Sequence, residues 1–115
     1  MGLLLARSGA SDRRRGVLDV QFRTEDLREC AEDERKATKS FGRAVGRKYH
    51  ERVNGLMQIE STQEIPRSWR FHPLKHEREG QFALDLNKDK GVRLVVTFPQ
   101  PGVLCVEEVN TVPYD

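Results

Sequence analysis

The chain has 115 residues, of which 37% are apolar and 33% are charged, and its formal net charge is +2 at pH 7. This length allows one small domain, and this composition allows the modest core of a small α+β fold. We expect no membrane partner, because no apolar run approaches the roughly 20 residues that span a bilayer. The first apolar residues precede the arginines, the reverse of the order in a secretion signal, so we expect a cytoplasmic protein.

The chain begins with a segment that predicts no regular structure. Residues 1–16 are rich in Gly, Ser and Arg, which is typical of a flexible tail. We therefore expect a single domain over residues 17–115. Its first strand is predicted over residues 17–23, where apolar and polar residues alternate. The apolar face of this strand consists of Leu18, Val20 and Phe22.

Helical periodicity follows this strand. Thr24 is suited to cap a helix, and two acidic residues follow it in the first turn. Apolar residues then recur mostly in steps of four, whereas Gly42 and Gly46 weaken a single long helix. We predict two helices, over residues 24–40 and 43–60, that form a hairpin and cover one face of a sheet.

The charges of the predicted hairpin are segregated along the chain. Residues 24–34 carry six acidic side chains and one arginine, whereas residues 35–52 carry seven basic side chains and one glutamate. One interpretation is a solvated helical surface whose charges follow the helix dipole. The other is a basic flank that binds RNA phosphates. The candidate RNA-binding residues of this flank are Arg43, Arg47 and Lys48.

Four more strands are predicted in the second half of the chain. They cover residues 69–74, 81–86, 92–98 and 104–109, with turn-forming residues between the last three. Pro73 interrupts the first of them, so that strand should lie at an edge or end at the proline. The element order predicts an α+β fold with a short N-terminal strand and a two-helix hairpin packed on a small, mainly antiparallel sheet.

The cysteines and histidines do not predict a metal site. Cys30 and Cys105 lie far apart, and neither has a second Cys or His at metal-ligand spacing. Such cysteines are typical of a reducing compartment, where they act as small apolar residues. His72 and His76 could share a metal only on a helix and with further ligands. We expect neither a metal nor a cofactor.

The segment Phe-His-Pro-Leu-Lys-His-Glu-Arg-Glu-Gly, from residue 71 to 80, is the most informative part of the chain. His72, Lys75 and Arg78 recur at every third position immediately before a strand. Arg93 lies on the neighbouring strand, on the face opposite its main apolar row. If that face meets the loop, these four residues form a concave, cationic phosphate site. Metal-free RNA cleavage requires such cations together with an acid and a base.

This segment resembles the His-Pro-Leu-Lys-x-x-Arg-x-Gly motif of the RelE/HigB superfamily, the toxin halves of bacterial type II toxin–antitoxin pairs. A charged helical run before it, the Arg-Leu-Val-Val-Thr-Phe strand at 93–98 and the Glu-Glu-Val strand at 107–109 extend the resemblance. The resemblance implies a RelE-like fold and a HigB-like endoribonuclease, of the plasmid maintenance system killer type, that cleaves mRNA in the ribosomal A site. The implied partners are the ribosome, mRNA and a helix-turn-helix antitoxin of the HigA kind.

The resemblance also implies roles for individual residues. Lys75 and Arg93 match basic active-site positions of HigB-type enzymes, and His72 and Arg78 match further positions of the motif. Arg93 is suited to stabilise the transition state because guanidinium binds phosphate through two hydrogen bonds. Imidazole exchanges protons near neutral pH, which suits His72 for acid–base work. The residues expected to contact RNA are Arg43, Arg47, Lys48, Arg70 and His76.

The C-terminus departs from the pattern of this family. Many HigB relatives end in an Asp-Tyr-His-like segment that supplies acid–base groups to the site. Here the chain ends in Val-Pro-Tyr-Asp, without a histidine. Tyr114, followed by Asp115, is the candidate for that role, and Tyr114 joins the four motif residues in the predicted catalytic set.

Alternatives remain open from the sequence. His72 could simply cap its strand, and Arg93 could pair with Asp85 across the sheet as a structural bridge. The chain could also be a ParE-like toxin that binds DNA gyrase, although such a toxin does not need the RNA-cleaving cations Lys75, Arg78 and Arg93. A degenerate RelE-fold binding protein would be consistent with the missing histidine.

Overall fold

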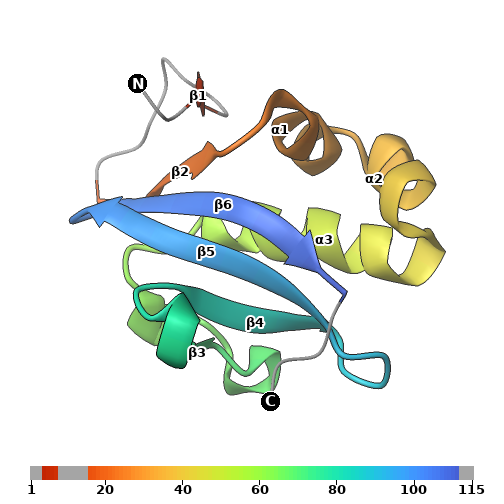
Figure 1. Cartoon of the computed structure of the whole chain (residues 1–115). Coiled ribbons are helices and arrows are strands. Elements are labelled where there is room, and N and C mark those ends of the chain that lie inside the picture. Colours follow the sequence, from red (N-terminus) through yellow and green to blue (C-terminus); the bar gives the residue numbers. More distant parts are fainter. Residues whose placement is uncertain (1–3, 8–15, 112–115) are drawn as a thin grey trace.

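One sheet organises the chain in the computed structural model, which describes residues 4–7 and 16–111. Within these residues the strand order across the sheet is β1-β2-β6-β5-β4-β3. In Figure 1 the longest helix passes behind the sheet. The strands and helices are β1 (Leu4–Arg7), β2 (Asp19–Phe22), α1 (Glu25–Glu32), α2 (Glu34–Phe41), α3 (Arg43–Leu56), β3 (His72–Pro73), β4 (Phe82–Asn87), β5 (Val92–Gln100) and β6 (Val103–Asn110). Single 3₁₀ turns are η2 (Thr62–Glu64), η3 (Arg67–Trp69) and η4 (His76–Arg78).

The strand directions agree with the predicted fold. β2 pairs with β6 in parallel, with Asp19 opposite Val103. The other neighbouring strands run antiparallel, including the long β5–β6 pair. The prediction of an α+β fold with a mainly antiparallel sheet is therefore confirmed.

The first predicted helix is divided in two. Thr24 caps α1 as expected, because its Oγ1 accepts a hydrogen bond from the backbone N–H of Leu27 at 3.2 Å. The helix then ends at Glu32, because the side chain of Asp33 accepts the backbone N–H of Arg35 at 3.0 Å and starts α2. An aspartate that caps a new helix competes with continuation of the old one. The prediction of one helix over residues 24–40 was wrong for this reason.

Glycines set the boundary and the spacing of the next two helices. Gly42 has φ +91°, a conformation that favours glycine, and it separates α2 from α3. Gly46 lies where the two helices touch, since a Cβ at this position would be 2.5 Å from Thr38 Cα. α3 ends at Leu56, four residues before the predicted end.

The main core fills the space between the helices and the sheet. Tyr49 is fully buried there, and its hydroxyl donates a hydrogen bond to the Leu27 carbonyl at 2.7 Å. Cys30 and Cys105 are both free and buried, but only Cys30 belongs to this core. Other core residues from the two layers are Phe22, Val53, Leu56, Leu84, Leu94, Val96, Leu104 and Val106.

A second, smaller core lies on the opposite face of the sheet. It consists of Leu74, Ala83 and Val95. Strand side chains alternate between faces, so Ala83 and Val95 point away from the main core that holds Leu84 and Leu94. Leu74 anchors the loop after β3 to this face, and its backbone N–H donates to the Gln81 carbonyl at 2.8 Å.

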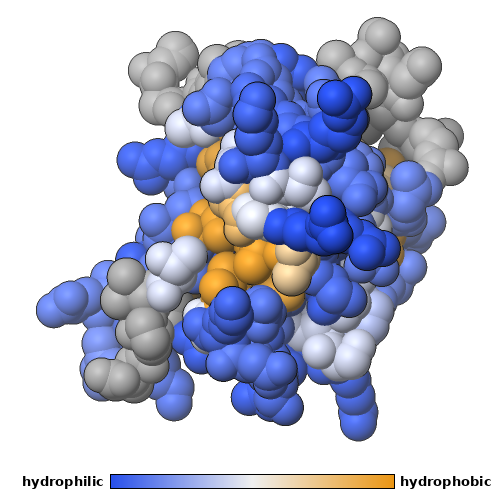
Figure 2. Space-filling view, turned by 90° about the vertical axis from the view of Figure 1, so that its right-hand side faces the viewer, coloured by the Kyte–Doolittle hydropathy of each residue, from blue (hydrophilic) through white to orange (hydrophobic). Residues whose placement is uncertain are grey.

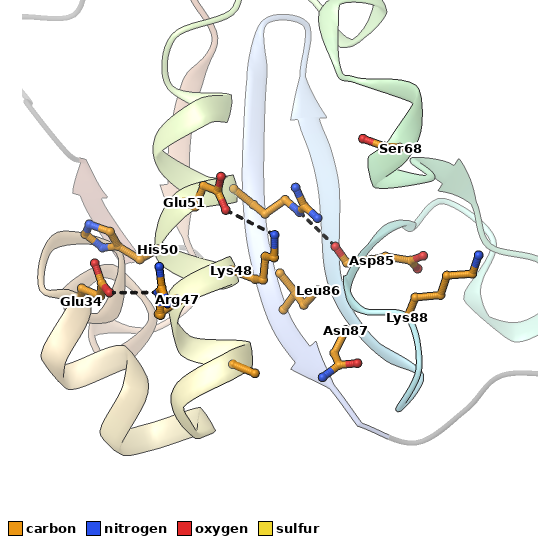
Figure 3. Close-up of a pocket in the computed structure, with 12 residues that line it drawn as sticks. Glu34, Arg47, Lys48, His50, Glu51, Ser68, Asp85, Leu86, Asn87 and Lys88 are labelled. Carbon is orange, nitrogen blue, oxygen red and sulfur yellow. Dashed lines mark hydrogen bonds and ion pairs between the residues drawn. The ribbon is translucent and has the colours of Figure 1, made fainter.

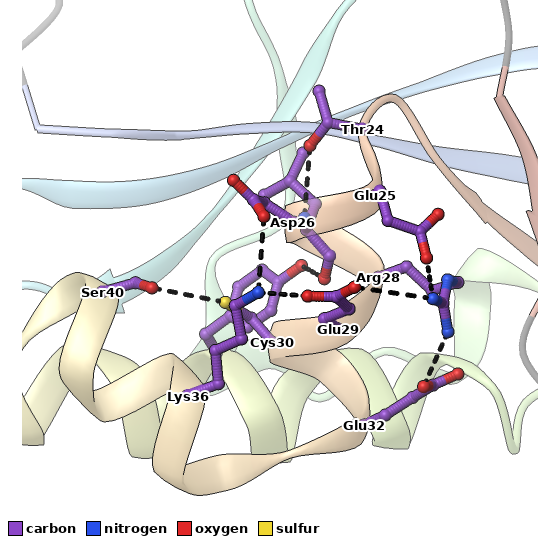
Figure 4. Close-up of polar contacts among 11 residues, drawn as sticks. Thr24, Glu25, Asp26, Arg28, Glu29, Cys30, Glu32, Lys36 and Ser40 are labelled. Carbon is purple, nitrogen blue, oxygen red and sulfur yellow. Dashed lines mark hydrogen bonds and ion pairs between the residues drawn. The ribbon is translucent and has the colours of Figure 1, made fainter.

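Ion pairs on the outside of α1 and α2 account for the first part of the charge pattern (Figure 4). Arg28 contacts Glu25 and also Glu32, the latter at 2.7 Å. Lys36 of α2 contacts Glu29 of α1, and this hydrogen bond raises the pKa of the lysine. These contacts agree with a solvated helical surface. Exposed pairs of this kind contribute little to stability, because water and salt screen them.

The N-terminal segment contains a strand. Leu4–Arg7 pairs antiparallel with β2 and covers the edge of β2 that faces away from β6. An open strand edge offers unpaired backbone groups, which gives a physical reason for this pairing. The expected tail over residues 1–16 therefore includes one ordered strand, and residues 1–3 and 8–15 lie outside the described residues.

One face of the molecule exposes apolar surface. Figure 2, which views the right-hand side of Figure 1, shows an apolar patch surrounded by hydrophilic residues. Phe41 at the end of α2 and Val109 near the end of β6 pack on the core but remain partly exposed. Among the described residues, no helix is long and apolar enough to cross a membrane.

The buried cysteine on β6 makes the free energy of unfolding depend on pH in the alkaline range. Burial, with a smaller effect of nearby Glu107, raises the pKa of the Cys105 thiol from 9.0 to about 12. Burial likewise raises the pKa of Tyr49. The folded state therefore holds protons that the unfolded state loses, so the free energy of unfolding should fall as the pH rises above about 9.

Denaturant unfolding at pH 8 and pH 10 measures this fall. Cys105→Ala should lose less stability between the two values than the unchanged protein does, because one of the buried acids is gone. An equal fall in both proteins would show that Cys105 does not carry the effect. The comparison uses the pH dependence alone, so a constant loss of packing energy in the variant does not affect it.

Candidate active site

A hollow of about 420 Å³ lies beside the small core, on the face of the sheet opposite the main core. Five of the residues that line it belong to the predicted site, and they come from β3, from the loop after it and from β5. These five residues are His72, Lys75, His76, Arg78 and Arg93. The structure thus brings together four of the five predicted catalytic residues and one predicted RNA-binding residue.

The local sequence explains how the loop reaches the hollow. β3 is only two residues long and ends at Pro73, which has no backbone N–H to donate to a further strand pair. The next residue, Leu74, is buried on the sheet. The chain between this anchor and Gln81 makes the η4 turn, which leaves Lys75 and His76 exposed at the rim.

His72 is held by its own backbone neighbourhood. Its Nδ1 lies 2.6 Å from the carbonyl oxygen of Arg70. A carbonyl only accepts hydrogen bonds, so Nδ1 carries the proton and Nε2 of the neutral ring carries the lone pair. His72 can therefore cap its strand, as the sequence allowed, and still present Nε2 to the hollow.

Arg78 is fixed by two partners that the sequence analysis did not identify. Its Nη1 donates to Gln81 Oε1 at 2.8 Å and to Glu108 Oε2 at 3.0 Å. Glu108 comes from β6, where it lies opposite Val95. The carboxylate holds the guanidinium in place and offsets part of its charge. The available signal was the pair Glu107 and Glu108 within the predicted strand at 104–109, but only the strand pairing shows that Glu108 reaches the loop.

Arg93 lies on β5 directly opposite Asp85 of β4. This is the position that a structural bridge between the two side chains would require. Asp85 forms an ion pair with Arg70, whose Nε lies 3.4 Å from Asp85 Oδ2. Arg70 was predicted to contact RNA, and it is not among the residues that line the hollow. Its side chain pairs with Asp85, and its backbone carbonyl contacts the His72 ring.

The basic residues of α3 lie in a different place. Arg47 and Lys48 line a larger groove of about 780 Å³ between α3 and β4 (Figure 3). Arg47 Nε lies 3.7 Å from Glu34 and Lys48 Nζ lies 3.7 Å from Glu51. Arg43 is exposed at the first residue of α3. The structure does not join these three residues to the hollow on the other face.

Arg52, which lines this groove, makes contacts that hold neighbouring elements together. Arg52 lies over the Trp69 ring at 4.6 Å from its centroid and donates from Nε to the Asp85 carbonyl at 3.1 Å. Burial lowers the pKa of this arginine. Trp69 in turn packs against Gly55 of α3. These contacts tie α3 to the loop that leads into β3 and so support the position of His72.

The hollow has the chemical properties of an anion site. Lys75, Arg78 and Arg93 bring positive charge to it, Glu77 brings one carboxylate, and the two imidazoles can exchange protons. Within residues 4–7 and 16–111 no three His, Cys, Asp or Glu side chains are placed to share a metal ion. Tyr114, the fifth predicted catalytic residue, lies outside the described residues, as does Asp115.

Comparison with known proteins bears on the fold. No protein-family model matches the sequence, and no curated protein matches it. Among solved structures, YafQ from E. coli strain BL21(DE3) is similar to the chain with a TM-score of 0.57 and 15% sequence identity. The similarity covers 82% of this chain and 92% of YafQ. At this identity the match establishes a shared fold, and it confirms the predicted RelE-like architecture.

Proposed function

We propose that the chain is the toxin of a type II toxin–antitoxin system and that it cleaves mRNA in the ribosomal A site. The observation that carries this proposal is the hollow, in which His72, Lys75, His76, Arg78 and Arg93 meet. The fold supports it, because YafQ is a RelE-family mRNA interferase toxin. A HigB-like substrate and mode of action follow from the sequence motif.

The proposed reaction is a transesterification that needs no further reactant. A base removes the proton of a ribose 2′-hydroxyl, and the 2′-oxygen attacks the neighbouring phosphorus. The bond from phosphorus to the 5′-oxygen breaks, and an acid protonates that oxygen. The products are a 2′,3′-cyclic phosphate and a 5′-hydroxyl. His72 is suited to act as the base, because its protonated Nδ1 leaves Nε2 free to accept a proton.

The cations of the hollow would stabilise the charge that builds up on the phosphate. Arg93 can offer two parallel hydrogen bonds to the pentacoordinate phosphorane. Lys75 adds a point charge from the rim, and Arg78 is held in a fixed position by Glu108. Because the hollow is open, the ribosome would hold the mRNA in the reactive geometry.

The same proposal names the partners and the compartment. A cognate helix-turn-helix antitoxin, of the HigA kind, would neutralise the protein in the cytoplasm. The apolar patch of Figure 2 has the character of a protein contact surface. Arg43, Arg47 and Lys48 would contact ribosomal or messenger RNA by a surface separate from the hollow.

Induced alone in a bacterial host, the protein should arrest growth, and primer extension should show new 5′ ends within translated mRNA. Co-expression of a cognate antitoxin should relieve the arrest. Unimpaired growth at confirmed soluble expression contradicts the proposal. Growth arrest with DNA breaks and intact mRNA would favour a ParE-like gyrase toxin, and ribosome binding without cleavage would favour a degenerate member of the fold.

A further inference from the structure

Two histidines line the same hollow. His72 belongs to β3, and His76 opens the η4 turn four residues later. The proposed reaction requires two proton transfers, from the 2′-oxygen and to the 5′-oxygen, and a different group normally performs each of them. The sequence motif accounts for His72, whereas Tyr114, the other acid–base candidate from the sequence, lies outside the described residues.

The backbone gives no reason for a histidine at position 76. His76 has φ +60°, in the left-handed region that non-glycine residues seldom adopt. The turn is held by hydrogen bonds from Arg78 N–H to the Lys75 carbonyl and from Glu79 N–H to the His76 carbonyl, both 3.1 Å long. Glycine would meet this backbone requirement at lower cost, and unusual backbone conformations of this kind cluster at functional sites.

The surroundings of the two rings differ. The His72 ring is oriented by the Arg70 carbonyl, which fixes its proton on Nδ1. The His76 side chain is exposed, and within residues 4–7 and 16–111 no hydrogen bond or ion pair engages its ring. Both of its nitrogens are therefore open to a ligand. The other charged groups that line this hollow are Lys75, Glu77, Arg78 and Arg93.

We propose that His76 is the general acid of the site, paired with His72 as the base. This assignment rests on the proposed function. In the reaction, His72 Nε2 takes the 2′-hydroxyl proton as the new bond to phosphorus forms. The protonated His76 ring gives its proton to the departing 5′-oxygen as the old bond breaks. One proton enters the protein and one leaves it, so the pair exchanges its protonation states in each turnover.

A set of substitutions separates the chemistry of His76 from its backbone role. His76→Gly and His76→Asn both tolerate the left-handed conformation, and neither side chain can act as a general acid. Both variants should unfold at a denaturant concentration equal to or higher than that of the unchanged protein. Single-turnover cleavage on programmed ribosomes should fall by about 10²- to 10⁴-fold in both. In the unchanged protein the cleavage rate should fall at high pH, where the general acid loses its proton. This fall should be absent from both variants.

A modified substrate tests the assignment directly. An mRNA with sulfur in place of the 5′-oxygen at the cleaved bond has a leaving group that needs no protonation. His76→Gly should cleave this substrate within about tenfold of the unchanged protein, whereas His72→Ala and Arg93→Ala should remain defective, because each retains a lesion that sulfur does not repair. Rescue confined to the His76 variants supports the assignment.

The possible failures are distinguishable. Full activity of His76→Gly on normal mRNA, with Arg93→Ala inactive, would overturn the role of His76 and leave the proposed function standing. Loss of activity without rescue by sulfur would make His76 a positioning residue and also overturn the assignment. If the unchanged protein cleaves neither mRNA on programmed ribosomes, the proposed function fails and this inference fails with it.

Discussion

Replacing Arg93 by alanine should lower single-turnover mRNA cleavage on programmed ribosomes by about a hundred- to a thousand-fold, or about 3 to 4 kcal/mol of transition-state stabilisation. The protein should stay folded, because the buried neighbours Leu94 and Val96 carry the packing of β5. Arg93→Lys should recover only part of the rate, since an ammonium group cannot reproduce two parallel hydrogen bonds to phosphate.

A matched control removes the same charge elsewhere. Arg35 is exposed on α2, away from the hollow, so Arg35→Ala should cleave mRNA at nearly the normal rate. Circular dichroism and ribosome co-sedimentation check that each variant is folded and bound. Near-normal cleavage by folded Arg93→Ala would assign Arg93 to a structural role, and the proposed active site would have to be abandoned.

Gly46→Ala should lower the free energy of unfolding by about 3 kcal/mol, at the upper end of the usual cost of overpacking. The added Cβ would lie 2.5 Å from Thr38 N and Cα and 2.6 Å from Ala37 C. These are backbone atoms of α2, so relief requires that α2 and α3 move apart. The gain of about 1 kcal/mol in helix propensity does not offset this cost.

Gly55→Ala, in the same helix, is the control for Gly46→Ala. Its Cβ would meet the edge of the Trp69 side chain at 2.9 Å, and a side chain can move where a backbone cannot. With the same gain in propensity, this variant should differ from the unchanged protein by about 1 kcal/mol or less. Denaturant unfolding followed by circular dichroism measures both variants. Equal stability of the two would show that the α2–α3 contact is not rigid.

Local patterns in the sequence were sufficient to predict most of the strands and the residues of the hollow. β5 was predicted to begin at Val92 and does so, because one row of alternating apolar residues follows a turn. Lys75 and Arg78 were placed in the site by their spacing before a strand. The helix break at Asp33 was missed because an acidic residue in a charged helical segment does not distinguish a cap from a surface position.

Contacts between distant segments could not be predicted in this way. Arg78 and Glu108 are 30 residues apart and meet only because β6 pairs with β5 beside the loop. The order of the strands, with β2 parallel to β6, leaves no local pattern in either strand. The left-handed conformation of His76 was also beyond the sequence analysis, since histidine is a rare choice at such a position.

The place of β6 in the sheet has a consequence for the order in which the fold is completed during synthesis. β6 is the last strand of the described chain, yet it lies between β2 and β5. A growing chain therefore cannot join β2 to the sheet, or supply Glu108 to Arg78, until residues 103–110 have been made and released from the exit tunnel. A toxin of the proposed kind would therefore lack the completed sheet and the Arg78–Glu108 contact while residues 103–110 are still inside the ribosome that makes it.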